Sequence, residues 1–202
     1  GQNLYTIPAD DAEAYAETGT AEVASPATIG MQFVCDTNCD GAIWQSASNP
    51  GGSTTNFVDN IGIIGVGTSV QATASMSSAN AVVMTAIRQQ ALGDSASNVL
   101  TNGGLIDVNA IALDVWQGSG TASAYAAVEA GIVQIAGEYN GGGSVAAVSI
   151  DNGGTIDFGA FASAAGSNAR ASAFMGPLVT QAAFANEAGG VASAEIVNTG
   201  SL

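Results

Sequence analysis

The first residues that could bind a ligand lie together in one short loop. Segment 36–41 reads Asp-Thr-Asn-Cys-Asp-Gly, so Asp36, Asn38 and Asp40 alternate oxygen-bearing side chains ahead of a glycine. Alternating oxygens followed by a tight turn can surround a hard cation, as at the start of a calcium loop. A complete loop of that type also needs a bidentate glutamate at its twelfth position, where this chain has Ala47. A calcium site and an acidic turn without a cation therefore both stay open.

The same loop holds the two cysteines of the chain, Cys35 and Cys39. We expect a disulfide that closes the loop in an oxidising compartment, and two unlinked thiols are the alternative. A zinc site has little support, because the chain has no histidine and no further cysteine to complete the ligand shell.

Carboxylates are the main acid–base groups that the chain offers, because it lacks histidine and lysine. Asp10 adjoins Asp11, while Asp107 and Asp157 occupy equivalent positions in two repeats. Two carboxyl groups in a cleft are enough for glycoside hydrolysis. Equivalent positions in a repeat instead favour solvent-facing strand residues, so we expect neither enzymatic activity nor an organic cofactor.

The elements that would position these residues recur along the chain. A phrase of the form Ile-x-Gln-x-Ala recurs at intervals of 43 to 47 residues, which is typical of a repeat protein. We predict that its glutamines stack into a ladder of amides, each satisfied by the repeat above and below. A row of glycan-binding side chains is the alternative. The glutamines are Gln45, Gln89, Gln134 and Gln181, with Gln2 extending the series.

A second phrase opens with asparagine and continues through glycine into an apolar strand. We predict a turn at each asparagine, because Asn and Gly both tolerate positive φ. The phrase begins at Asn60, Asn102, Asn152 and Asn198, and we align the segment that starts at Thr18 with it.

Side chains in both phrases alternate with period two, which indicates strands. We predict an all-β chain, a parallel β-solenoid of about four repeats of 43–47 residues in a single domain. Ile43, Ile87, Ile132 and Val179 should then point into one core. The alternative is an antiparallel β-sandwich of the pilin type that exchanges a donor strand. The predicted units are a half repeat at 1–17, repeats at 18–59, 60–101, 102–151 and 152–197, and the start of another at 198–202.

Charge excludes some partners. Seventeen acidic residues face two basic ones, for a net charge of −15. Nucleic acids and anionic membranes are bound by Lys and Arg, so neither is an expected partner. No apolar run approaches the ~20 residues needed to cross a bilayer, so we expect no membrane insertion. We expect a secreted protein whose signal peptide has been removed.

The segment from Asn152 to Phe158, Asn-Gly-Gly-Thr-Ile-Asp-Phe, and the Ala-x-Ala strand after it carry a resemblance. They resemble the repeat regions of large secreted bacterial surface proteins, such as adhesins and autotransporter passengers, which form β-solenoids. This resemblance implies an extracellular, cell-surface location and a structural or adhesive role. The chain lacks the Gly-Gly-x-Gly-x-Asp array of calcium-binding β-rolls.

The two ends of the sequence suggest how copies of the chain associate. We interpret 1–17 as the second half of a repeat, with a closing strand around Ala14, and 198–202 as the opening of another. Together they supply the strands that each end lacks, which predicts a head-to-tail fibre. A section of a longer array is the alternative explanation, and an adhesive or surface-glycan-binding module is the alternative function. The predicted assembly residues are Gly1, Gln2, Ala12, Ala14, Ala16, Asn198 and Leu202.

Overall fold

The computed structural model describes residues 3–4, 12–16, 20–25, 28–32, 43–72, 76–115, 121–137 and 143–202. In this part of the chain every strand pairing is parallel and no helix occurs, so the prediction of an all-β chain with parallel sheets is confirmed. The antiparallel sandwich is wrong for the same residues. None of them forms a helix that is long and apolar enough to span a membrane. The strands are β1 (Asn3–Leu4), β2 (Ala12–Ala16), β3 (Thr20–Ser25), β4 (Thr28–Gln32), β5 (Ile43–Asn60), β6 (Ile63–Ala72), β7 (Met76–Val83), β8 (Ile87–Asn102), β9 (Leu105–Val115), β10 (Thr121–Val128), β11 (Ile132–Ala136), β12 (Val145–Asn152), β13 (Thr155–Ala165), β14 (Asn168–Met175), β15 (Val179–Ala183) and β16 (Val191–Asn198).

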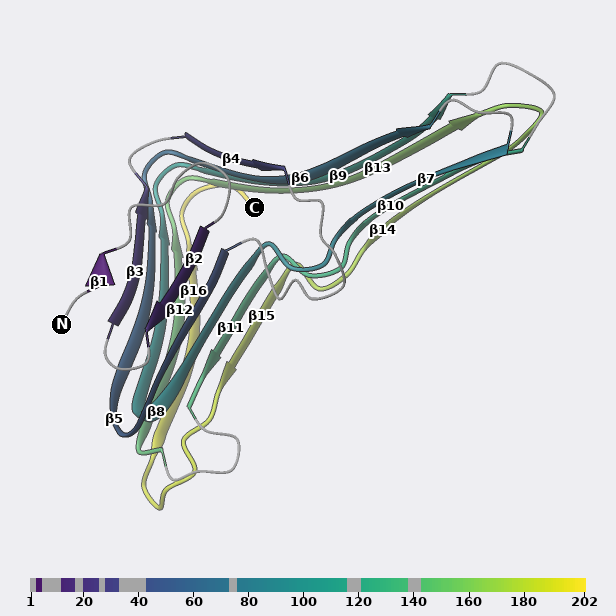
Figure 1. Ribbon diagram of the computed structural model, residues 1–202. Helices are drawn as coiled ribbons and strands as arrows, with labels where there is room; N and C mark the ends of the chain where they lie inside the picture. Colours follow the sequence, from purple (N-terminus) through teal and green to yellow (C-terminus); the bar gives the residue numbers. More distant parts are fainter. Residues whose placement is uncertain are drawn as a thin grey trace.

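The strands form two arms that meet at a bend (Figure 1). The first arm is a nine-stranded sheet with the order β1-β3-β5-β8-β11-β15, to which β2, β12 and β16 also pair. Because β5 and β8 turn back at the far end of this arm, the sheet folds over into two facing layers. The second arm places the four-stranded sheet β13-β9-β6-β4 against the three-stranded sheet β14-β10-β7.

Strand register joins residues that lie one repeat apart in the sequence. Ile43 pairs with Ile87, Ile87 with Ile132, and Ile132 with Val179. The three isoleucines are fully buried in the main core, and Val179 packs against it. Alternating burial along β8 and β9 turns one face of each strand inward, as the period-two pattern predicts.

Alanine fills the core of the second arm. Ala110 and Ala112 of β9 belong to the same buried cluster as Ala124 and Ala126 of β10. Side chains this small leave no voids only when the two sheets approach closely. The alanine content thus makes the second arm thin.

The first repeat differs from its predicted alignment. β2 pairs with residues 43–47, so it corresponds to the Ile-x-Gln strand and not to a closing strand. Ala14 is the register partner of Gln45, a position that the sequence pattern assigns to Gln2. Similarly, Ser25 and not Thr18 pairs with Asn60. Short Ala-x-Ala segments fit several strands equally well, so pairing with the neighbouring strands decides their register.

Each asparagine of the second phrase stands at a corner between the arms. The corner glycines do not use the left-handed conformation that we expected, because among the described residues only Gly137 and Gly189 have positive φ. They instead make room for the next repeat. A Cβ on Gly104 would lie 2.0 Å from the carbonyl oxygen of Gly62, and one on Gly154 would lie 2.0 Å from that of Gly104. Glycine is needed here because two backbones nearly touch.

Candidate functional site

The four glutamines of the repeat form one continuous ladder inside the first arm. Gln89 donates through Nε2 to Gln45 Oε1 at 2.7 Å, and Gln134 donates to Gln89 at 2.7 Å. Gln181 extends the series by donating to Gln134 at 2.8 Å. The side chains of Gln45, Gln89 and Gln134 are fully buried. Every one of these bonds is donated toward the N-terminal end of the stack.

Each glutamine also binds the facing layer of the same arm. One amide hydrogen of each glutamine reaches a backbone carbonyl there, at 2.8 to 3.1 Å. A buried amide left unpaired is costly, and Gln89, Gln134 and Gln181 each use both amide hydrogens in this arrangement. The ladder therefore ties neighbouring repeats together and also ties the two layers of the arm. The accepting carbonyls belong to Phe57, Val99, Ser149 and Glu195.

The corner asparagines form a second ladder that runs in the opposite direction. Asn60, Asn102 and Asn152 each donate through Nδ2 to Oδ1 of the asparagine in the following repeat, at 2.7 Å. Each also donates to a backbone carbonyl beyond that next corner, at 2.9 to 3.0 Å. These bonds point toward the C-terminal end of the stack. The two ladders therefore make the ends of the stack chemically different.

Sequence reasoning missed the asparagine ladder, and it also missed a shorter pair of stacked amides. Asn56 donates to Asn98 Oδ1 at 2.8 Å, and Asn98 donates to the carbonyl of Ile135 at 2.6 Å. The pair ends there because the next register position is Val148. The signal was present in the sequence, since Asn56 and Asn98 each stand four residues before a corner asparagine.

The predicted carboxylate pair lies on the second arm. Asp107 and Asp157 are register partners on adjacent strands, and Asn109 donates to Asp107 from the same face. Among the described residues, no three His, Cys, Asp or Glu side chains gather closely enough to hold a metal ion. The predicted calcium ligands Asp36, Asn38 and Asp40, and the cysteines Cys35 and Cys39, lie outside the described residues.

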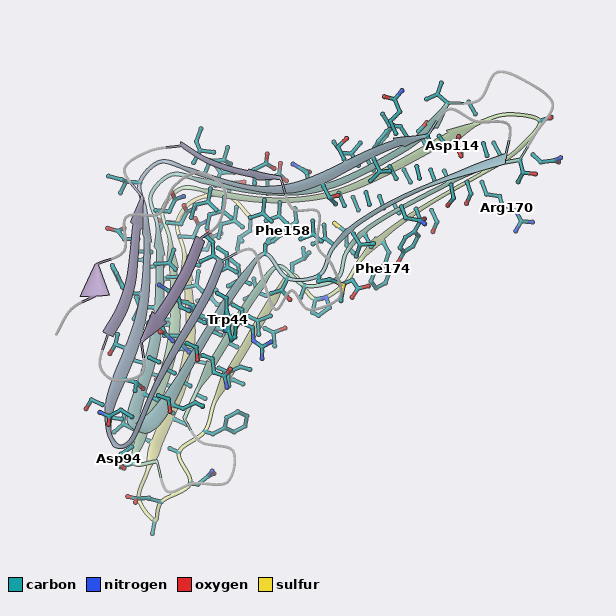
Figure 2. The ribbon with its side chains drawn as sticks, in the orientation of Figure 1. Trp44, Asp94, Asp114, Phe158, Arg170 and Phe174 are labelled. Atoms are coloured by element: carbon teal, nitrogen blue, oxygen red, sulfur yellow. The ribbon has the colours of Figure 1, made fainter. Side chains whose placement is uncertain are left out.

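Two other acidic residues stabilise the far ends of the arms (Figure 2). Asp114, fully buried near the end of the second arm, accepts a hydrogen bond from the Ser123 amide at 2.9 Å. Asp94, at the end of the first arm, accepts one from the Ser144 amide at 3.2 Å. Both carboxylates therefore accept hydrogen bonds from backbone amides where the chain reverses direction.

One end of the stack is uncovered. β13, β14, β15 and β16 are the outermost strands of their sheets, and we call the surface they form the C-terminal face. Every residue of β14 and β16 is exposed, although their inner neighbours β10 and β12 are largely buried. Its exposed large apolar side chains are Phe161, Phe174, Met175, Val191, Ile196 and Val197, with Leu202 beside them.

The uncovered residues are core residues of the repeat. Ile196 is 47% exposed, whereas Ile150, its register partner one repeat earlier, is 2% exposed. Ala171 of β14 is likewise exposed, while its partner Ala124 and the next partner Ala79 are buried. The C-terminal face therefore carries side chains of the kind that the following repeat covers elsewhere in the stack.

The ladders also end open on this face. Within the described part of the chain, Gln181 Oε1 receives no hydrogen bond, and Asn198 Nδ2 donates none. Gln181 donates to the repeat before it, so its oxygen is the ladder atom that remains as an acceptor. Asn198 accepts from the repeat before it, so its nitrogen remains as a donor. Edge strands with unpaired backbone groups are templates for strand addition.

The chain shows no significant match to a known family, to a curated protein or to a solved structure. The most distinctive functional feature on the described residues is thus the C-terminal face, with its open ladders and uncovered core.

Proposed function

We propose that this chain is a non-enzymatic structural protein, a parallel β-solenoid whose copies join end to end into an extracellular fibre. Successive repeats supply β5, β6 and β7, then β8, β9 and β10, in the same spatial order. Register links each of these strands to its counterpart one repeat later. In the proposed solenoid, one repeat is one turn through both arms.

The continuous amide ladders are the observation that carries the fibre proposal. Each ladder joins one repeat to the next through the same side-chain hydrogen bond, so a second copy could extend the series by that bond. The strands of the C-terminal face present the same kinds of core side chains and ladder amides. A contact between two different ends does not close on itself, so repeated contacts of this kind build a fibre.

Charge supports a fibre that is held together by backbone pairing and apolar packing. With two basic residues against seventeen acidic ones, ion pairs can contribute little to the contact between copies. Repulsion between copies of charge −15 should oppose assembly at low salt. The extracellular and cell-surface location is part of this proposal and rests on the sequence resemblance.

Electron microscopy of the purified chain tests the proposal. We expect filaments whose length and yield increase with salt, because the screening length falls from about 30 Å at 0.01 M to about 8 Å at 0.15 M. Light scattering over the same salt series should rise in parallel. Single compact particles at every salt and protein concentration would contradict the fibre and favour a section of a longer array.

A further inference from the structure

Two of the corner asparagines are followed by a glycine that packing does not require. Gly103 follows Asn102, and Gly153 follows Asn152. A Cβ on either glycine would have its nearest neighbour at 3.8 Å, which is ordinary van der Waals contact. Neither glycine has a positive φ. The glycine one position later in each corner is needed because two backbones nearly touch, but these two have no such reason in the folded stack.

An asparagine that precedes a glycine is prone to lose ammonia from its side chain. The backbone nitrogen of the glycine attacks the side-chain carbonyl carbon, Cγ, of the asparagine. A bond forms between that nitrogen and Cγ, the nitrogen loses its proton, and the Cγ–Nδ2 bond breaks to release ammonia. Water then opens the resulting cyclic imide on one side or the other and leaves an aspartate or an isoaspartate. Glycine favours the attack because it has no Cβ to hinder it.

In the folded stack both reacting groups of the first corner are held by hydrogen bonds. Asn102 is 1% exposed, and its Nδ2 donates to Asn152 Oδ1 at 2.7 Å and to the Thr155 carbonyl at 3.0 Å. Its Oδ1 accepts from Asn60 at 2.7 Å. The attacking nitrogen, that of Gly103, donates to the Asn60 carbonyl at 2.7 Å. An attack on Cγ would require the amide to rotate out of the ladder and break these bonds.

The corner one repeat later is held in the same way. Asn152 is fully buried, and its Nδ2 donates to Asn198 Oδ1 at 2.7 Å and to the Ser201 carbonyl at 2.9 Å. The backbone nitrogen of Gly153 donates to the Asn102 carbonyl at 2.8 Å. All of these bonds join one repeat to another. They therefore exist only while the repeats are stacked.

We propose that the asparagine ladder protects Asn102 and Asn152 from this conversion, and that a chain left unfolded is converted at both sites and cannot rebuild the ladder. An ionised aspartate at position 102 has no side-chain hydrogen to donate, so the acceptors on Asn152 and Thr155 would face a buried negative charge. Such a charge is costly to bury. Isoaspartate also adds a carbon to the main chain, which disturbs the register beyond it. Prolonged unfolding thus becomes irreversible, whether or not copies of the chain form a fibre.

Peptide mass mapping of folded and unfolded protein tests the protection. Both samples are kept in one mildly alkaline buffer, one of them with guanidinium chloride, and conversion is followed at each asparagine. We expect conversion at Asn102 and Asn152 in the unfolded sample only. Asn60 and Asn198 precede β-branched residues, so they are internal controls that should convert slowly in both samples. Equal rates at Asn102 in the two samples, or no conversion there in the unfolded one, would overturn the proposal.

Two variants test the consequence for folding. Gly103→Ala/Gly153→Ala fits the stack and hinders the attack, so after prolonged unfolding and removal of denaturant it should recover its circular dichroism signal more fully than the wild type. The Asn140-Gly141 pair is common to both proteins and cannot cause a difference. Equal recovery would contradict the proposal. Asn102→Asp places one product in the ladder without any unfolding, and we expect a lower thermal midpoint. A midpoint equal to that of the wild type would show that the converted residue leaves the ladder intact, which also contradicts the proposal.

Discussion

The two arms of this molecule fill their interiors in different ways. The first arm contains two amide ladders, in which every buried donor points along the stack or across it. The second arm contains mainly alanine and valine side chains between its sheets. Amides specify which strand may lie next and in which register, because a slip leaves them unpaired. Alanines specify the distance between the sheets. The amides of the first arm therefore determine the order of the strands, and the alanines of the second arm determine how closely its sheets pack.

Breaking the glutamine ladder at its centre should produce the largest effect. Gln89→Leu removes the donor to Gln45 and the acceptor from Gln134, both buried. Each buried polar group left unpaired costs about 1–3 kcal/mol, so we expect a loss of roughly 3 kcal/mol in the free energy of unfolding. Urea denaturation followed by circular dichroism measures it.

Gln181→Leu is the matched control for that variant. The same change at the open end removes only the bonds to Gln134 and to the Glu195 carbonyl, on the exposed face. One buried acceptor, on Gln134, loses its donor, so we expect about 1 kcal/mol of destabilisation there, less than at Gln89. Equal losses at Gln89 and Gln181 would mean that the ladder does not hold the repeats together.

Enlarging a side chain between the sheets tests the second arm. Ala124 is buried, and three added carbons would have to force the sheets apart, so Ala124→Leu should cost about 1–3 kcal/mol. Ala171→Leu makes the same change in the same register on the open edge, where there is room. Thermal melting of both variants should show a lower midpoint for Ala124→Leu only. A normal midpoint for that variant would show that the second arm is loosely packed.

The smallest expected effect concerns charge between copies. If β3 of one copy pairs with β16 of another, Glu22 would lie beside Glu195, because both align with Phe57 through the register of the sheet. Like charges directly opposite one another oppose strand pairing. Glu195→Gln should therefore allow filaments to form at lower salt than the wild type. Light scattering against salt concentration measures this shift.

Glu187→Gln is the control for that variant, because it removes the same charge from a turn of the chain outside the strands. It should shift the salt dependence less. Identical curves for both variants would indicate that total charge alone, and not the Glu22–Glu195 register, governs assembly.

Much of this molecule follows from the sequence by itself. The spacing of Gln45, Gln89, Gln134 and Gln181 determined the repeat, and the alternation of side chains determined that it consists of strands. Both are local or periodic properties, which is why they can be read without coordinates. The glutamine ladder is stacked as this spacing predicts, whereas the asparagines, which the sequence predicts only as turn residues, form a second ladder.

Only the tertiary structure decided how the repeats lie on one another. It placed Ala14 and not Gln2 beside Gln45, since an alanine-rich strand takes its register from the strands that flank it. It also showed that Gly104 and Gly154 are needed because backbones of successive repeats approach each other, not because of their φ. Register and close approach are contacts between residues far apart in the chain. No local pattern contains them, so they appear only when the whole stack is assembled.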